Sequence, residues 1–267
     1  MDKKELRIAF ASDLHLRRFA TWTWDNYLSF PQYADVIVLA GDIGEGHKTT
    51  IVVVEDLARK YPNSQLVVVA GNHEFYNCDE DYLLRTIRQT FADNERVHFL
   101  ENDSVEIQGI TFLGCTLWSD FSICGDVRIA RAAAKQNVAD FTYIHSHGKD
   151  FTPAHAARKF RASRRFLNQA LANCQPENTV VVTHFSPGLE TANPLFDKSP
   201  ITAYFQSNVI DLIETHQPAV WIYGHNHYSA ELQIGRTKVV SNQLGYGAEI
   251  GTIPAYDPSK VIVLEGI

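Results

Sequence analysis

The sequence lacks any apolar run that approaches the roughly 20 residues a membrane-spanning helix requires. The apolar stretch at residues 6–11 is too short for the core of a signal peptide, and no cleavage pattern follows it. Internal repeats and low-complexity stretches are also absent. We therefore expect a cytoplasmic protein that has no membrane partner.

Cysteine is scarce, and its positions are scattered. No pair has the close spacing of a zinc knuckle or a redox motif. Isolated thiols in a chain of this size are typical of reduced, structural residues, so we expect neither a disulfide framework nor a thiolate metal site. The cysteines are Cys78, Cys115, Cys124 and Cys174.

Basic residues are outnumbered, with 24 Lys and Arg against 31 Asp and Glu and a formal net charge of -7. A surface for duplex nucleic acid needs a basic face, so this balance argues against a nucleic-acid partner. It is compatible with a small anionic substrate, because bound divalent cations would dominate the local field. Nothing in the composition indicates an oligomeric state.

Short apolar runs rich in β-branched residues recur along the chain of 267 residues. Each is apolar along its whole length and ends at a polar or glycine-containing turn, which is typical of strands buried on both faces. These predicted strands are residues 8–11, 36–40, 66–70, 180–183 and 220–223.

Helical patterns and a second set of strands lie between these runs. Helices are predicted at residues 49–60, 79–92 and 202–216. The second strands alternate more clearly and predict a partly antiparallel second sheet, at 97–100, 105–108, 111–113, 231–234, 238–241 and 261–265. We predict an α/β sandwich of sheets flanked by helices, in one domain over residues 1–267.

Segment 119–174 differs from the rest in its few β-branched runs and its many alanines and arginines. We predict a helical insertion between two core strands that caps the functional site. Its cations could grip an anionic substrate, or the segment could simply cover one sheet face with solvated arginines. The cations are Arg128, Arg131, Lys135, Arg158, Lys159, Arg161, Arg164 and Arg165.

Polar residues with metal-ligand chemistry follow all five buried runs. Each fragment alone is more typical of a turn, but all five occur in order at predicted strand ends, where α/β sheets bind ligands. Nitrogen and oxygen donors without thiolate favour manganese, iron, zinc or nickel. The fragments are Asp13-Leu14-His15, Gly41-Asp42, Gly71-Asn72-His73-Glu74, His184 and Gly224-His225-Asn226-His227.

These fragments resemble the calcineurin-like metallophosphoesterase superfamily, whose pattern is D-x-H, G-D, G-N-H-[DE], a lone His and G-H-x-H. The match is complete and spans residues 13–227. The closer resemblance is to small bacterial-type members. It implies a four-layer sandwich in which two mixed β-sheets are flanked by helices.

The resemblance also implies a role for each residue. Asp13, His15 and His227 would hold one divalent metal ion, Asn72, His184 and His225 a second, and Asp42 would bridge both. A metal-bridging hydroxide would then attack phosphorus, as two ions roughly 3.5–4 Å apart allow. His73 would be catalytic and protonate the leaving oxygen, since histidine can be protonated near neutral pH.

One segment departs from a well-known branch of this superfamily. Protein serine/threonine phosphatases carry G-D-x-x-D-R-G, in which the arginine grips the phosphate. Here Gly46 stands at the arginine position, which disfavours a protein phosphatase. Glu45 stands where the branch has the Asp that orients the catalytic histidine, so Glu45 could orient His73 as a second catalytic residue or simply precede a helix.

We therefore predict a dinuclear-metal-dependent phosphoester hydrolase that acts on a small molecule. Monoester and diester remain open, with a slight preference for diesters because a diester has less charge to neutralise. One alternative is a catalytically silent protein-binding scaffold of the same fold, which the complete ligand set disfavours. Another is a nuclease of the same superfamily, which the acidic charge disfavours.

Overall fold

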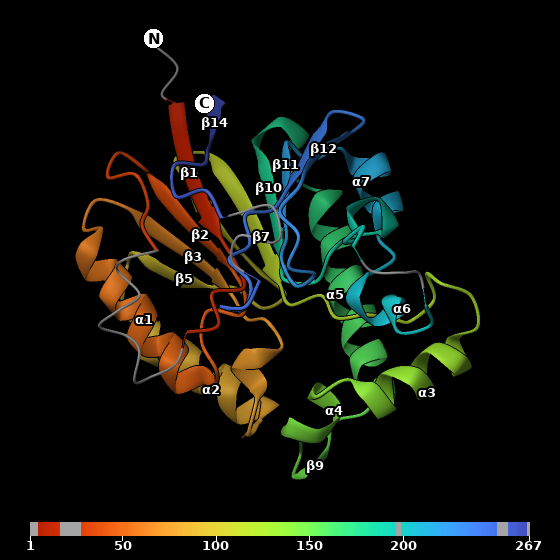
Figure 1. Cartoon of the computed structure of the whole chain (residues 1–267). Helices are drawn as coiled ribbons and strands as arrows, with labels where there is room; N and C mark the ends of the chain where they lie inside the picture. The colour runs from red at the N-terminus through yellow and green to blue at the C-terminus, as the bar shows by residue number, and fades with distance from the viewer. Residues whose placement is uncertain (1–4, 17–27, 196–198, 250–255, 266–267) are drawn as a thin grey trace.

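The computed structural model describes residues 5–16, 28–195, 199–249 and 256–265. Two large β-sheets lie face to face, and helices cover the outer side of each (Figure 1). This confirms the α/β sandwich that the sequence patterns predict and the four layers that the family resemblance implies.

The first sheet has the strand order β14-β1-β2-β3-β5, with β14 antiparallel to β1 and the other pairs parallel. Because β1, β2 and β3 run in the same direction, their carboxyl ends reach one edge. The strands are β1 (Glu5–Ala11), β2 (Val36–Ala40), β3 (Gln65–Val69), β5 (Val97–Phe99) and β14 (Val261–Glu265).

The second sheet has the order β12-β13-β11-β10-β7-β6, with a parallel centre and an antiparallel strand at each edge. Its strands are β6 (Asp103–Ile107), β7 (Ile110–Cys115), β10 (Thr179–Thr183), β11 (Val220–Ile222), β12 (Glu231–Ile234) and β13 (Thr237–Val240).

The predicted division of strands between the sheets is wrong for four strands. The alternating patterns of β5 and β14 predict the second sheet, yet both strands pair within the first. The fully apolar β10 and β11 are central strands of the second sheet. Apolar patterning reports how many faces of a strand are buried, and it carries no information about which strand lies beside it.

The core follows the two-residue period of a strand. Along β2, Val36 and Val38 face the second sheet and pack in one cluster with Val180 and Val182 of β10. The intervening Ile37 packs instead in the cluster on the helix side. The central strands β2, β10 and β11 are thus buried on both faces.

Helices cover both outer faces (Figure 1). On the first sheet these are α1 (His47–Lys60) and α2 (Glu80–Phe91), and beside the second sheet lie α5 (Pro153–Leu171) and α7 (Ile210–His216). Across the described part of the chain, none of the helices has both the length and the apolarity needed to cross a membrane. Single 3-10 turns form η3 (His73–Phe75), η4 (Pro176–Asn178) and η5 (Leu189–Thr191).

The single helix predicted at 202–216 is wrong, because two short helices occupy this range. α6 (Thr202–Phe205) and α7 are separated by Gln206 to Val209. The backbone N–H of Ser207 donates to the Ser186 carbonyl at 2.8 Å, and that of Val209 donates to the Pro187 carbonyl at 3.0 Å. These tertiary hydrogen bonds replace the helical ones that a continuous pattern would have made.

Segment 119–174 lies between β7 and β10 and has two parts. Its second half is α5, which packs on β7 and connects two neighbouring parallel strands. Its first half contains α3 (Val127–Asn137), α4 (Asp140–Tyr143), β8 (Ile144–Ser146) and β9 (Lys149–Asp150). β8 pairs with β4 (Cys78–Asp79) in a small third sheet that the sequence does not predict, because strands this short show no period.

Candidate metal centre

The structure brings all seven predicted metal ligands together at one edge of the sandwich. β1, β2 and β3 of the first sheet and β10 and β11 of the second end at this edge. These side chains come from two facing sheets, whereas the rule that ligands bind at strand ends describes a single open sheet. They are Asp13, His15, Asp42, Asn72, His184, His225 and His227, and all but the half-buried His15 and His227 are buried.

The loops that carry these ligands have unusual backbone geometry. Asp13, His15, Asp42, His225 and His227 have positive φ angles of 56°, 46°, 51°, 78° and 50°. Non-glycine residues seldom adopt this left-handed region, and each typically costs about 1–3 kcal/mol. Hydrogen bonds between the loops offset that cost, for example from the backbone N–H of His15 to the Asp42 carbonyl at 3.0 Å.

Glycines bring the loops into close contact with the ligands. A Cβ atom added at Gly41, Gly71 or Gly224 would lie less than 3.0 Å from a side-chain atom of His184, Asp42 or Asp13, respectively. The three motif glycines therefore leave space for ligand side chains.

One group of ligands consists of Asp13, His15 and His227. His15 Nε2 lies 3.0 Å from His227 Nε2, which lies 3.5 Å from Asp13 Oδ1. With metal–ligand bonds near 2.0–2.2 Å, ligands around one ion stand about 3–3.5 Å apart. The spacing of these three atoms fits a single cation.

A second group consists of Asp42, Asn72, His184 and His225. The Nδ1 atom of His184 lies 2.9 Å from the Ala40 carbonyl, which can only accept, so Nδ1 carries a proton. In its neutral, metal-binding form His184 would present the lone pair of Nε2, which lies 2.9 Å from Asn72 Oδ1 and 3.4 Å from Asp42 Oδ2. A bound cation would be stabilised by the electron-rich atoms that converge at this point.

A buried nitrogen atom without a hydrogen-bond partner also indicates a cation site. His225 Nε2 is buried and has no hydrogen-bond partner in the described part of the structure. A buried polar atom without a partner typically costs about 1–3 kcal/mol, so such an atom calls for an explanation. The donor set, imidazole with carboxylate and amide oxygen, fits transition-type divalent ions.

The charges around the ligands favour an added cation. Burial raises the pKa of Asp13, yet the hydrogen bond from His227 and the charge of His184 outweigh it and lower the pKa to about 2. Burial lowers the pKa of His184, but the Asp42 carboxylate more than reverses this and raises the pKa to about 9. The buried carboxylates thus stabilise positive charge at this edge.

Two histidines of the cluster, His15 and His225, stay neutral. Burial lowers the pKa of His15 to about 4, and it lowers the pKa of His225 well below the ordinary range. A neutral imidazole is the form that binds metal, so both side chains are poised as ligands.

The predicted general acid, His73, lies at the same point. Its Nε2 atom is 3.9 Å from Asp42 Oδ2 and 3.2 Å from the Tyr246 hydroxyl. Its ring stacks on Tyr76 with the centroids 4.3 Å apart. Its backbone N–H donates to Asp42 Oδ1 at 2.8 Å, which leaves the ring beside the ligands.

Glu45 is exposed on the loop that precedes α1. Its carbonyl accepts a hydrogen bond from the Thr49 hydroxyl at 3.3 Å, at the start of the helix. Its role in orienting His73 stays a prediction.

Glu74 is a structural residue of the site whose role the sequence analysis did not predict. This buried carboxylate accepts backbone N–H bonds from Asp42 at 2.9 Å and Gly71 at 2.6 Å, and further bonds from Ile43, Gly44 and Thr50. It ties the loops after β2 and β3 together. Its place inside the G-N-H-E motif was the available signal.

Glu249 and Tyr246 were also missed, and no motif marks either of them. Glu249 Oε2 lies 2.7 Å from His227 Nδ1, which directs His227 Nε2 toward Asp13. A carboxylate behind a histidine ligand commonly fixes its tautomer and raises its basicity. The Tyr246 ring packs against His15 at 4.3 Å.

A cavity of about 810 Å³ opens beside the ligands. Asp42, Asn72, His73, His225 and His227 lie at its metal end. No Lys or Arg lines it among the residues that the structure describes. The rest of the lining consists of apolar, amide and hydroxyl side chains and the carboxylates of Asp140 and Glu249: Tyr76, Asn137, Val138, Ala139, Asp140, Leu189, Ala192, Asn193, Pro194, Ser199, Ile201, Thr202, Tyr204, Phe205, Gln206, Asn226, Tyr246 and Glu249.

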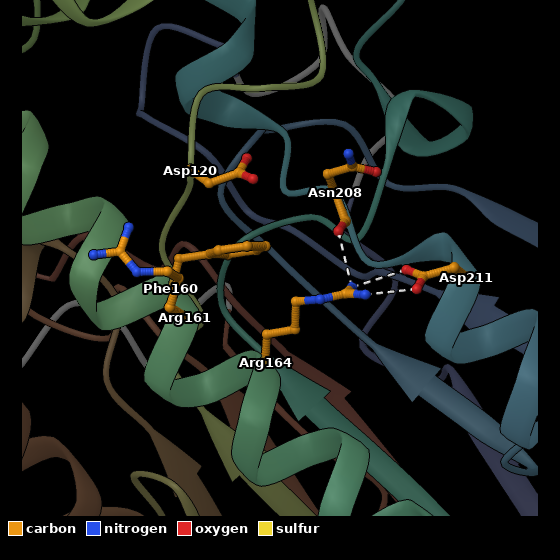
Figure 2. A pocket seen from close by; sticks show the side chains of 6 residues that line it. All are labelled: Asp120, Phe160, Arg161, Arg164, Asn208 and Asp211. Atoms are coloured by element: carbon orange, nitrogen blue, oxygen red, sulfur yellow. Dashed lines mark hydrogen bonds and ion pairs between the residues drawn. The ribbon is translucent and has the colours of Figure 1, made fainter. Parts of the chain in front are cut away.

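The cations of segment 119–174 therefore do not line this cavity. Arg161 and Arg164 lie at a separate pocket of about 420 Å³ with Asp120, Phe160 and Asn208. Figure 2 shows that Arg164 reaches across this pocket to Asp211, with which it makes hydrogen bonds of 2.8 and 2.6 Å. The remaining cations are exposed, paired or packed elsewhere: Arg128, Arg131, Lys135, Arg158, Lys159 and Arg165.

Comparison with known proteins identifies the family. The model of the calcineurin-like phosphoesterases matches residues 6–229, which is most of the chain. The protein belongs to this family and is a metal-dependent phosphoester hydrolase.

Individual relatives are distant. An uncharacterized protein, L509, of Acanthamoeba polyphaga mimivirus is 24% identical over 276 residues, which cover 93% of this chain and 94% of that protein. The crystal structure of the phosphopantetheinyl hydrolase of Mycobacterium tuberculosis is similar with a TM-score of 0.74 and 18% identity, over 97% of this chain and 96% of that one. At this identity the structural likeness shows the shared fold.

Proposed function

We propose that the protein hydrolyses phosphoesters at a dinuclear metal centre. The observation that carries the proposal is the position of Asp42 between the two ligand groups. Its Oδ2 atom lies 3.8 Å from His15 Nε2 and 3.4 Å from His184 Nε2. A carboxylate placed in this way would bridge two ions, with Asp13, His15 and His227 on one side and Asn72, His184 and His225 on the other.

Two bound divalent ions would polarise the phosphoryl group and lower the pKa of the attacking water. The residues of the chain supply the rest of the chemistry. Their fixed loops hold the ligands before substrate arrives, which avoids reorganisation during the reaction. His73, beside Asp42, would deliver a proton from its imidazole nitrogen to the departing oxygen.

We propose an uncharged organic group as the leaving group. The cavity beside the metal end offers apolar and amide walls, and the described lining residues provide no cation for a second anionic group. This favours a phosphodiester or monoester whose organic part is uncharged over a nucleotide polyphosphate. Residues 137–140 contribute to the wall, so segment 119–174 would cap the site through this stretch rather than through α5.

Metal analysis combined with a substrate panel tests the proposal. The purified chain should bind two equivalents of manganese, iron, zinc or nickel and should hydrolyse aryl phosphate mono- or diesters. A phosphopantetheinyl diester belongs in the panel, because its chain is uncharged and amide-rich and the mycobacterial enzyme of similar fold is named for that group. Two bound ions without turnover of any ester would favour the silent scaffold, and salt-sensitive DNA binding with DNA cleavage would favour the nuclease.

A further inference from the structure

Asp140 is a buried carboxylate that the family motifs do not include. It is the first residue of α4, in the segment between β7 and β10, and it is 1% exposed. Burial raises the pKa of its carboxyl group, and hydrogen bonds from Tyr204, Tyr76 and Asn72 oppose this effect. A buried carboxylate is expensive, so its contacts indicate what it does.

The first contact is with a predicted metal ligand. Asn72 Nδ2 donates to Asp140 Oδ1 at 3.0 Å. Since this oxygen also accepts from a tyrosine hydroxyl, the amide of Asn72 can only face it with its NH₂ group. The amide oxygen then points the other way, to within 2.9 Å of His184 Nε2.

The opposite amide rotamer would be costly on both sides. It would place the Asn72 oxygen against the Asp140 carboxylate and turn the NH₂ group toward the metal centre. An NH₂ group has no lone pair available for a metal ion, so the ligand would be lost. Asp140 therefore selects the one orientation of Asn72 that can bind metal.

Two tyrosines extend the network around the same carboxylate. The Tyr76 hydroxyl donates to Oδ1 at 2.7 Å, and the Tyr76 ring stacks on His73. The Tyr204 hydroxyl donates to Oδ2, and the Tyr204 ring meets His225 edge-on at 5.8 Å between centroids. Asp140 thus contacts groups that touch both a metal ligand and the predicted general acid.

The backbone holds Asp140 in register with the Asn72 loop. The N–H of Asn77 donates to the Tyr143 carbonyl at 2.7 Å, and Cys78 pairs with Ile144 in the small third sheet. The Ser146 hydroxyl donates to Glu80 at 2.7 Å. The segment that carries Asp140 is therefore fastened to the chain that follows Asn72.

We propose that Asp140 is a positioning residue that orients the Asn72 amide oxygen toward the metal centre and so couples segment 119–174 to metal binding. The inference rests on the proposed metal centre. It predicts that Asp140 affects the ion bound by Asn72, His184 and His225 more than the ion bound by Asp13, His15 and His227.

Calorimetric titration of the metal-free protein with Mn²⁺ tests this. In Asp140→Asn, one of the two binding events should weaken by about 10–100-fold, the usual effect of removing a residue that supports a ligand. The other event should stay within about threefold. Asp126→Asn is the matched control, because it makes the same change at an exposed carboxylate at the start of α3 in the same segment, and both of its affinities should stay near wild type.

A reciprocal exchange distinguishes positioning from general structural support. The double variant Asn72→Asp/Asp140→Asn keeps an amide–carboxylate hydrogen bond but reverses it, so an oxygen faces the metal centre in either rotamer. In the double variant, the Mn²⁺-binding event that Asp140→Asn weakens should recover most of its lost affinity.

Several results would overturn the inference. These are unchanged Mn²⁺ affinities in Asp140→Asn, equal weakening of both events, or a double variant that binds no better than Asp140→Asn. If wild-type protein binds two ions but hydrolyses no ester, the proposed reaction fails and the positioning role still stands on the titrations. If wild-type protein binds no Mn²⁺, both proposals fail.

Discussion

The loops at the strand ends and segment 119–174 contribute to the same cavity in different ways. The loops supply every predicted metal ligand from residues spaced along the whole chain. Segment 119–174 supplies Asp140 and part of the wall, and its arginines and lysines lie elsewhere. Chemistry and its support therefore come from regions with different sequence signatures.

The two regions have different sequence signatures because their side chains must meet different structural requirements. A metal ligand must be a particular residue type at a fixed strand end, so it leaves a motif. A wall residue must only fill space, and a supporting carboxylate must only reach its ligand, so neither requires a recurring pattern. Charge in segment 119–174 suggested a phosphate grip, but most surface charges serve solvation or local pairing.

The largest expected effect comes from the loops. Asp42→Ala removes the carboxylate between the two ligand groups, so metal content and kcat should fall together, with activity reduced by about 10³-fold or more. Metal analysis and turnover of an aryl phosphate measure both. Asp93→Ala, at an exposed aspartate, should change neither. Normal turnover with two bound ions in Asp42→Ala would refute the bridging role.

His73→Ala should keep its metal ions and lose about 10²–10⁴-fold in kcat, the usual contribution of a general acid. The loss should shrink for esters with good leaving groups, which need less protonation. A series of aryl esters of graded leaving-group pKa measures this, with the exposed His147→Ala as control. An equal loss across the series would contradict the acid role, and loss of metal would indicate a ligand or a support.

Val138→Ala tests the wall that segment 119–174 contributes. It removes two methyl groups from the cavity lining, so KM should rise about fourfold to fifteenfold for esters with a bulky apolar group, which corresponds to one or two buried carbons at about 0.8 kcal/mol each. KM for a small ester such as methyl phosphate should not change. Val263→Ala, on an exposed position of β14, is the control. Equal KM values for bulky esters in both variants would place the substrate elsewhere.

Arg161→Ala should have the smallest effect, with KM and kcat within about twofold of wild type for anionic esters. Arg161 lines the separate pocket of Figure 2 rather than the metal cavity. Steady-state kinetics at low salt, where charge effects are largest, provide the strictest measurement. A tenfold rise in KM would restore the hypothesis that cations of segment 119–174 grip the substrate.

The sequence predicted which side chains meet at this edge better than it predicted the arrangement of the strands. Asp13, His184 and the other candidate ligands could be grouped because each follows a buried strand, and strand burial is visible as an apolar run. The placement of β5 and β14 could not be predicted, because the pattern of one strand does not identify the strand beside it. Asp140 and Glu249 act through hydrogen bonds to residues far away in the chain, and such contacts leave no local pattern.

The close approach of Gly41, Gly71 and Gly224 to the ligands has an evolutionary consequence. Adding one methyl group at any of the three would displace a ligand side chain, so a change at a residue with no chemistry of its own would act like the loss of a ligand. We therefore expect mutations to abolish metal binding at more positions than there are candidate ligands. A descendant of this protein that abandons catalysis could do so through its glycines while every ligand is still encoded.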